Sequence, residues 1–395
     1  MILPSSTTPQ DFLATYWQKR PVLLPQTLNH AALPTLTPDE LAWLAKQPDV
    51  ESRIVFAERT AANISFRVEH GPFEDDYFGK LPDQDWTILV QDIDKHLPEF
   101  VGWFDQVPFV PPWRIDDLMV SFAAPGGSVG PHGDNYDVFL CQGSGTRRWQ
   151  ISDDRSLPAD ENSTDLALLR PFVATATHSC RQGDVLYLPP GIPHWGVAVD
   201  RCTTYSIGMR APSRRELAVC GSRVFSRPES EMPQRGDADV DEFYVDPDLR
   251  LDETSGARIS ARSIDRLYEQ ELIDGALNPN EAATVLGSQV TDPKAWLDPE
   301  RLSPDEARLA ATGEKRLNVH GMARLAWYEG TESGIAFVNG EAREVNRSCI
   351  QLLRQLCDHG NVRPAQVQEL NESPENTEFF YWLLEQGAFD LQSEC

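Results

Sequence analysis

Positive charge and cysteine are both scarce in this sequence of 395 residues. Lysine and arginine number 35 against 61 aspartates and glutamates, so the formal net charge is −26. A field of this sign repels nucleic-acid phosphates and attracts basic partners, which argues against direct nucleic-acid binding. The seven cysteines are odd in number and include no C-x2-C pair, which favours neither a disulfide framework nor a zinc ribbon and predicts a reducing, cytoplasmic location.

Long apolar runs are missing too. No stretch approaches the ~20 apolar residues of a membrane span, and the first ten residues lack the basic and apolar regions of a secretion signal. We therefore expect neither membrane insertion nor secretion. With 41% hydrophobic and 24% charged residues, the composition is that of a folded globular protein, and the length predicts two or three domains.

The first half of the chain is rich in short strands. Two capped helix starts, at Thr8 and Thr37, come first. From about residue 54 to residue 210, short runs of β-branched and aromatic residues are separated by Gly, Pro and Asp, which predicts a sandwich or barrel. The expected strands cover residues 86–90, 118–122, 136–140, 147–151, 185–188 and 203–208.

Helices dominate the next region and a mixed region ends the chain. Residues 214–225 and 263–273 are expected to be helical. Beyond about residue 316, two short strands, a hairpin turn at Asn339-Gly340 and two helices are typical of a winged-helix module. Because residues 321–395 hold five arginines, no lysine and twelve acidic residues, we expect this module to contact protein and not DNA. The predicted domains are 1–210, 211–315 and 316–395.

Two histidine motifs in the strand-rich region carry the chemistry. His132 and Asp134, two residues apart, would point to the same face of a strand and could bind one ion. Alone, H-x-D is a weak signal, because such a pair is more commonly a surface hydrogen-bonded pair. A second segment, Gly183 to His194, has the spacing G-x5-P-x-G-x2-H, which resembles the second motif of cupins, while Gly126-x5-His132 resembles the first. Together they predict His132, Asp134 and His194 as the two-histidine, one-carboxylate set that leaves positions open on Fe(II).

A third segment indicates which family of cupin-like proteins the chain resembles. Gln142 to Trp149 has the pattern Q-G-x-G-x-R-x-W, which resembles a strand of Jumonji C and related 2-oxoglutarate oxygenases. Together with residues 16–21 and 117–122, it makes nearly the whole chain similar to the bacterial ribosomal oxygenases. The resemblance implies a mainly β fold with α: a double-stranded β-helix (the cupin or Jumonji C barrel), a helical dimerisation region and a winged-helix-like C-terminal domain. The sequence departs from the general cupin pattern at Ala198, where a non-ligand Asn is usual.

The same resemblance implies an activity. It is that of an Fe(II)- and 2-oxoglutarate-dependent protein hydroxylase, which consumes O2 and forms succinate and CO2. The implied substrate is the sixteenth protein of the large ribosomal subunit, a basic protein hydroxylated at the β-carbon of one arginine, and the implied assembly is a homodimer. The implied roles are metal binding by His132, Asp134 and His194, cosubstrate binding by Arg147 and Ser206, and substrate binding by Asp117, Met119 and Tyr136.

Two other function classes stay open. One is a metal-dependent cupin isomerase or dioxygenase that does not use 2-oxoglutarate, and the other is a non-catalytic winged-helix regulator. An inward-facing arginine argues against the first, because an isomerase has no dicarboxylate to hold. Period-two alternation lets only one of Arg147 and Arg148 face inward, and the motif selects Arg147. His178 lies outside both motifs and is expected to be a surface histidine.

Overall fold

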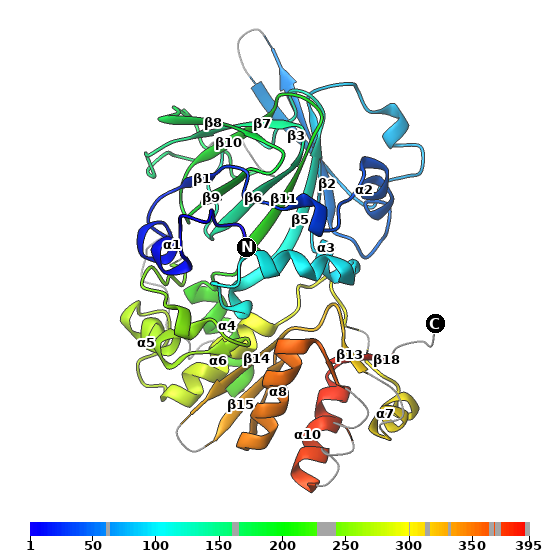
Figure 1. Cartoon of the computed structure of the whole chain (residues 1–395), viewed down its shortest axis with the longest axis vertical. Helices are drawn as coiled ribbons and strands as arrows, with labels where there is room; N and C mark the ends of the chain where they lie inside the picture. The colour runs from blue at the N-terminus through cyan, green and yellow to red at the C-terminus, as the bar shows by residue number, and fades with distance from the viewer. Residues whose placement is uncertain are drawn as a thin grey trace. The chain divides into compact units, whose positions relative to one another are not determined.

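The computed structural model describes residues 1–60, 64–159, 166–226, 242–299, 301–312, 317–330, 333–362, 367 and 373–391. Contacts divide the chain into two compact units, residues 1–108 with 115–209 and residues 109–114 with 210–395. Each unit has its own sheets and its own helices (Figure 1). No helix in the described ranges is long and apolar enough to cross a membrane.

Short helices open the first unit where the capping signals predict them. Helix α1 (Pro9–Thr15) begins after Thr8, whose hydroxyl accepts a hydrogen bond from the Asp11 amide, and α2 (Pro38–Leu44) begins after Thr37 in the same way. Leu41 and Leu44 are buried, so α2 is fixed by packing as well as by its cap. The remaining short helices before the central strands are η1 (His30–Ala32), η2 (Phe78–Lys80), α3 (Ile93–His96) and η3 (Pro98–Gln106).

Two antiparallel sheets form the predicted barrel. The larger has the strand order β1-β9-β6-β11-β5-β4-β2-β3 and the smaller the order β10-β7-β8. Leu140 and Leu186 of the larger sheet share one hydrophobic core with Trp149 and Ile151 of the smaller, which confirms the mainly β fold of this region. The strands are β1 (Val22–Leu24), β2 (Ser52–Arg59), β3 (Ile64–His70), β4 (Trp86–Val90), β5 (Ile115–Ala123), β6 (Val138–Ser144), β7 (Thr146–Ile151), β8 (Ala176–Arg181), β9 (Val185–Leu188), β10 (His194–Ala198) and β11 (Cys202–Met209).

Strand register decides which side chains face the interior of the barrel. Met119 of β5 pairs with Ser206 of β11, and Asp117 pairs with Gly208 on the same two strands. Because side chains alternate along a strand, residues 117, 119 and 121 share one face with residues 204, 206 and 208. This face carries Asp117, Met119 and Ser206, three of the predicted site residues.

The second unit contains a sheet with a helix on each face. The strand order is β12-β14-β15-β16, and Ala336 and Phe337 of β15 lie in two different cores. Phe337 packs in the core that contains Leu286 of α6, whereas Ala336 packs in the core that contains Leu353 of α8. The sheet strands are β12 (Arg258–Ile259), β14 (Leu325–Glu329), β15 (Gly334–Val338) and β16 (Glu341–Val345), and the predicted turn at Asn339-Gly340 joins the last two. The other elements are η4 (Pro112–Arg114), α4 (Arg214–Phe225), η6 (Leu251–Glu253), α5 (Ala261–Glu269), α6 (Pro279–Thr291), α7 (Pro304–Ala311), β13 (Leu317–Val319), α8 (Arg347–His359), β17 (Asn361–Val362), α10 (Pro374–Glu385) and β18 (Phe389–Leu391).

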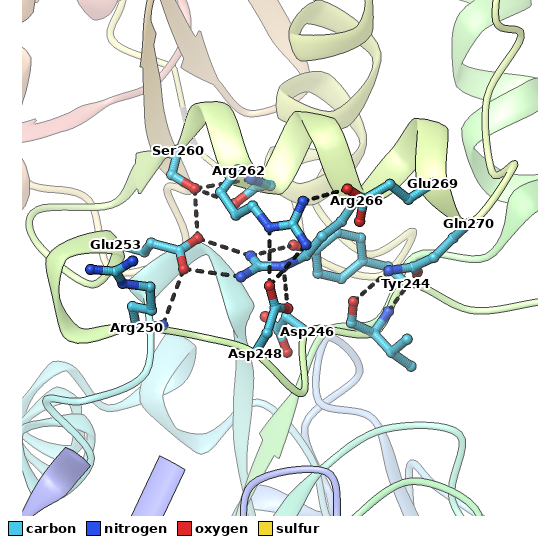
Figure 2. Close-up of polar contacts among 12 residues, drawn as sticks. Tyr244, Asp246, Asp248, Arg250, Glu253, Ser260, Arg262, Arg266, Glu269 and Gln270 are labelled. Atoms are coloured by element: carbon cyan, nitrogen blue, oxygen red, sulfur yellow. Dashed lines mark hydrogen bonds and ion pairs between the residues drawn. The ribbon is translucent and has the colours of Figure 1, made fainter. Parts of the chain in front are cut away.

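A buried ion-pair network holds α5 in this unit (Figure 2). The Arg266 guanidinium, which is 2% exposed, donates to both carboxylate oxygens of Glu253 at 2.9 and 3.0 Å, and to Asp248 at 2.8 Å. The Tyr244 hydroxyl lies beside it at 3.4 Å. Two parallel hydrogen bonds to one carboxylate match the geometry of a guanidinium. Arg266 therefore anchors the segment around residue 250 to α5.

Candidate active site

The three predicted metal ligands lie close together. Their potential ligand atoms are all within 4.8 Å of one another, and no other group of three or more such residues occurs in the described ranges. The Asp134 carboxylate is 4.0 Å from Nε2 of His132 and 3.7 Å from Nε2 of His194. One carboxylate facing two imidazole nitrogens at this spacing is a donor set suited to a divalent transition metal.

One expectation about these ligands was wrong in detail. His132 and Asp134 do not lie on a strand: they lie in the loop between β5 and β6, where His132 forms an isolated bridge with His194. The loop is held by the second motif, because the amide of Gly191 donates to the carbonyl of Asp134 at 2.7 Å. Gly191 has a φ of +70°, a conformation that glycine adopts without strain. The two motifs therefore build the site by contacting each other.

Both histidines are oriented by their own loops. Nδ1 of His132 lies 3.0 Å from the carbonyl of Gly130, and Nδ1 of His194 lies 2.9 Å from the carbonyl of Ile192. A carbonyl only accepts, so each Nδ1 carries a proton, and each Nε2 faces the carboxylate of Asp134. Burial, and then the neighbouring His132, lowers the pKa of His194 to about 4, so its ring is neutral near pH 7. Neutral imidazole is the form that binds metal.

Arg147 is buried in the wall opposite the larger sheet. It is 3% exposed on β7, whereas Arg148 beside it is exposed, as the alternation predicts. Its Nε and Nη2 atoms are buried and have no hydrogen-bond partner among the described residues, and the guanidinium lies 5.6 Å from the centre of the Trp149 ring. An unpaired buried cation is costly, so the arrangement fits an anionic ligand such as the far carboxylate of 2-oxoglutarate.

All eight predicted site residues line one cavity of about 320 Å³. Asp117 and Ser206 are buried at 7% and 4% exposure, Met119 is half-buried, and Tyr136 exposes 40% of its surface. The carboxylate of Asp134 first, then burial and the carboxylates of Asp117 and Asp116, raise the pKa of Tyr136 well above its ordinary value. Its hydroxyl therefore keeps its proton and can donate a hydrogen bond.

The cavity also has a polar wall that the sequence motifs did not reveal. Arg53 of β2, Thr87 of β4 and Gln91 just after β4 line it together with Asp116 of β5. No motif marks these residues, and Arg53 and Gln91 precede the histidine motifs by many residues in the sequence. Alternation along the strands could predict which face of its own strand each residue occupies. It could not predict which strand lies next to β5, and so it could not place these residues in the cavity.

Comparison with known proteins decides the family. A model of the JmjC domain matches residues 103–217, and a model of the ROXA-like winged helix matches residues 270–390. The probable ribosomal oxygenase of Haemophilus influenzae is 30% identical over 389 residues, which are 95% of this chain and 92% of that protein. This chain belongs to the ribosomal oxygenase family. It is an oxygenase of the JmjC class with a winged-helix C-terminal part, as the sequence predicted.

Other members of the family are similar in sequence and in structure. The ribosomal protein uL16 3-hydroxylase of Escherichia coli is 42% identical over 207 residues; this match spans 52% of the chain and only about half, 54%, of that relative. An X-ray structure of E. coli ycfD is 30% identical, with a TM-score of 0.74 over 99% of this chain and 100% of that one. The structure of the E. coli ribosomal oxygenase YcfD in complex with cobalt and 2-oxoglutarate is 29% identical, with a TM-score of 0.69 over 97% of this chain and 98% of that one.

Proposed function

We propose that this ribosomal oxygenase hydroxylates an arginine of ribosomal protein uL16 at the β-carbon, using Fe(II), O2 and 2-oxoglutarate and releasing succinate and CO2. The observation that carries the proposal is one cavity that contains both a His-Asp-His cluster and a buried arginine without a partner. The first is a site for Fe(II), and the second is a site for a dicarboxylate. The similarity to a uL16 3-hydroxylase supports the choice of substrate.

The metal site consists of His132, Asp134 and His194. Three protein ligands leave coordination positions for 2-oxoglutarate and O2, and the bound metal supplies the oxidative chemistry that converts them and hydroxylates the substrate. The chain itself fixes the ligands, because each Nδ1 proton is held by a main-chain carbonyl. Preset ring orientations lower the cost of assembling the site when the metal arrives.

Arg147 and Ser206 hold the cosubstrate in this proposal. The Arg147 fork has two unsatisfied nitrogens, enough for both oxygens of a carboxylate, and Ser206 presents a hydroxyl from the facing strand β11. An isomerase that binds no dicarboxylate would leave Arg147 buried, charged and unpaired. This is the physical reason to prefer a 2-oxoglutarate oxygenase over the other cupin activities.

Asp117, Met119 and Tyr136 hold the target arginine. Asp117 is buried, and its Oδ2 accepts a hydrogen bond from the Asp92 amide at 3.2 Å, which fixes the carboxylate. Gly208 lies beside the other oxygen: a Cβ atom there would lie 3.2 Å from Oδ1 of Asp117. In this proposal the carboxylate pairs with the target guanidinium, while the Tyr136 hydroxyl and the Met119 side chain contact the rest of the side chain.

The proposal extends to assembly and location. It places the metal site in a catalytic domain of residues 1–210, a homodimer contact in the helical region of residues 211–315, and a winged-helix domain that contacts protein in residues 316–395. The helical region exposes Val219 of α4 to 55%, a position suited to a subunit contact. Sedimentation of the full chain and of Val219→Asp tests the dimer. The −26 charge supports a basic protein partner and no direct nucleic-acid binding, and the odd number of cysteines without a C-x2-C pair supports a cytoplasmic protein.

Intact-mass analysis of uL16 tests the reaction. We expect a gain of one oxygen after incubation with the protein, Fe(II), ascorbate and 2-oxoglutarate, and no gain when 2-oxoglutarate is left out. Consumption of 2-oxoglutarate without added oxygen on uL16 would contradict uL16 as the substrate but would still support an oxygenase. If 2-oxoglutarate is not consumed and uL16 gains no oxygen, the assignment as a 2-oxoglutarate oxygenase would be contradicted.

A further inference from the structure

The cavity is also lined by a second cation, the half-buried Arg53, one of whose nitrogens is buried and has no hydrogen-bond partner among the described residues. Nε of Arg53 is buried without a hydrogen-bond partner, as is Oγ1 of Thr87, and both residues line the cavity. No hydrogen bond or ion pair of the Arg53 side chain occurs within the described residues. An unmade hydrogen bond of a buried donor carries the full cost of its desolvation. This donor therefore points to a ligand group, just as Arg147 does on the other wall.

The sheet register puts this cation next to the proposed substrate pocket. Arg53 of β2 pairs with Leu89 of β4, and Leu89 pairs with Ser121 of β5. Residues 53, 89, 91 and 121 therefore face the cavity in neighbouring rows, and the cavity continues from β5 over β4 to β2. The charge of Arg53 also acts on Tyr136, against the effect of Asp117 and Asp116. Arg53 and the target-arginine pocket thus share one enclosure.

The proposed ligands of the site do not satisfy Arg53. The target guanidinium is a cation and pairs with Asp117, and the two carboxylates of the cosubstrate are taken by the metal and by Arg147. What the substrate still offers is its main chain, whose carbonyl oxygens are acceptors. Gln91 stands beside Arg53 on the cavity wall, and its amide both donates and accepts, which matches the alternating N–H and C=O groups of an extended chain.

We propose that Arg53 and Gln91 form a second subsite that binds the main chain of the protein substrate beside the target arginine. The inference rests on the proposed uL16 hydroxylation. It adds that the site selects an arginine that is part of a polypeptide, because it also binds the main chain. Arg53 donates to a carbonyl oxygen of the substrate, and Gln91 completes the contact with a neighbouring peptide group. Neither residue touches the metal ligands or the cosubstrate arginine in this assignment.

The test compares Arg53→Met with a matched control on the same sheet. Arg67 of β3 is 48% exposed and does not line the cavity, so Arg67→Met removes an equal charge without touching the site. For Arg53→Met we expect the Kd of fluorescently labelled uL16 and its KM to rise about tenfold or more, the usual effect of losing a hydrogen bond from a charged group. The cosubstrate KM and the kcat at saturating uL16 should stay within about twofold, and Arg67→Met should match the wild type.

A second variant and a competitor separate the alternatives. Gln91→Leu should raise the same Kd about fivefold, which keeps the proposal testable if Arg53→Met fails to fold. Methylguanidinium, which mimics only the side chain, should have the same inhibition constant (Ki) against uL16 in the wild type and in Gln91→Leu. Tighter uL16 binding by Arg53→Met would overturn the proposal, because Arg53 would then only repel a cationic substrate. A raised cosubstrate KM would also overturn it and assign Arg53 to 2-oxoglutarate.

The proposed function fails in a different way. If the wild-type protein neither binds nor hydroxylates uL16, the substrate assignment falls and the subsite falls with it. If the wild type hydroxylates uL16 and both variants bind it with unchanged Kd, only the subsite is overturned.

Discussion

The main chains of His132 and His194 exchange two hydrogen bonds. The amide of His132 donates to the carbonyl of His194 at 3.0 Å, and the amide of His194 donates to the carbonyl of His132 at 2.8 Å. Their rings lie 4.3 Å apart between centroids. The distance between the two imidazole ligands is thus set by main-chain pairing and does not depend on side-chain packing alone. A metal that binds there finds both nitrogens already in place.

Removing one ligand should abolish metal binding while leaving the fold intact. We expect His132→Ala to lower Fe(II) affinity by at least about 100-fold, more than the usual loss of an outer hydrogen bond, and to stop 2-oxoglutarate turnover. His178→Ala is the control, because His178 is half-buried on β8, outside the cluster. Metal content by mass spectrometry and thermal unfolding check both variants. Wild-type metal content in His132→Ala would refute the triad.

Loss of the buried guanidinium should weaken cosubstrate binding. Arg147→Met leaves one carboxylate of the cosubstrate without its charged donors, so the cosubstrate KM should rise roughly 10- to 100-fold. Arg148→Met is the matched control, since that side chain is exposed on the same strand. Succinate formation measured over a range of cosubstrate concentrations gives the change. An unchanged KM in Arg147→Met would move the role to another cation.

Changing Asp117 should separate substrate hydroxylation from cosubstrate decay. Asp117→Asn keeps an oxygen for the Asp92 amide but removes the charge that pairs with the target arginine. We expect kcat/KM for uL16 to fall about 100-fold, while 2-oxoglutarate decay without substrate stays within about twofold of the wild type. Asp83→Asn, at a fully exposed site, controls for net charge. Equal losses in both reactions would argue against a substrate contact.

The ion-pair network of the second unit should contribute strongly to its stability. Arg266→Met leaves the buried Glu253 without its charged partner, which typically costs about 3 to 5 kcal/mol in the free energy of unfolding. Arg262→Met removes a 39% exposed partner of Asp248 and should cost less than about 1 kcal/mol. Urea unfolding monitored by tryptophan fluorescence compares the two. Similar values would mean that Glu253 finds water or another donor once Arg266 is gone.

The sequence by itself determined the elements and the chemistry of the site. Capping residues fixed the starts of α1 and α2, alternation left one inward position for Arg147 or Arg148 and the family motif selected Arg147, and two motifs that resemble cupins identified His132, Asp134 and His194 as one cluster. Helix capping and strand alternation depend on near neighbours in the chain, so local rules suffice to predict them. The metal cluster joins two motifs far apart in the chain, and it was predicted from their joint resemblance to a known family.

Only the tertiary structure decided how distant strands meet. His132 and Asp134 lie in a loop and not on a strand, where an isolated bridge joins His132 to His194, the first residue of β10. Arg53 and Gln91 reach the cavity because β2 and β4 extend the sheet beyond β5. Strand order depends on pairing between segments far apart in the chain, and alternation within one strand carries no information about its neighbour. That is why the metal site could be predicted from its motifs, whereas the polar wall opposite it emerged only from the fold.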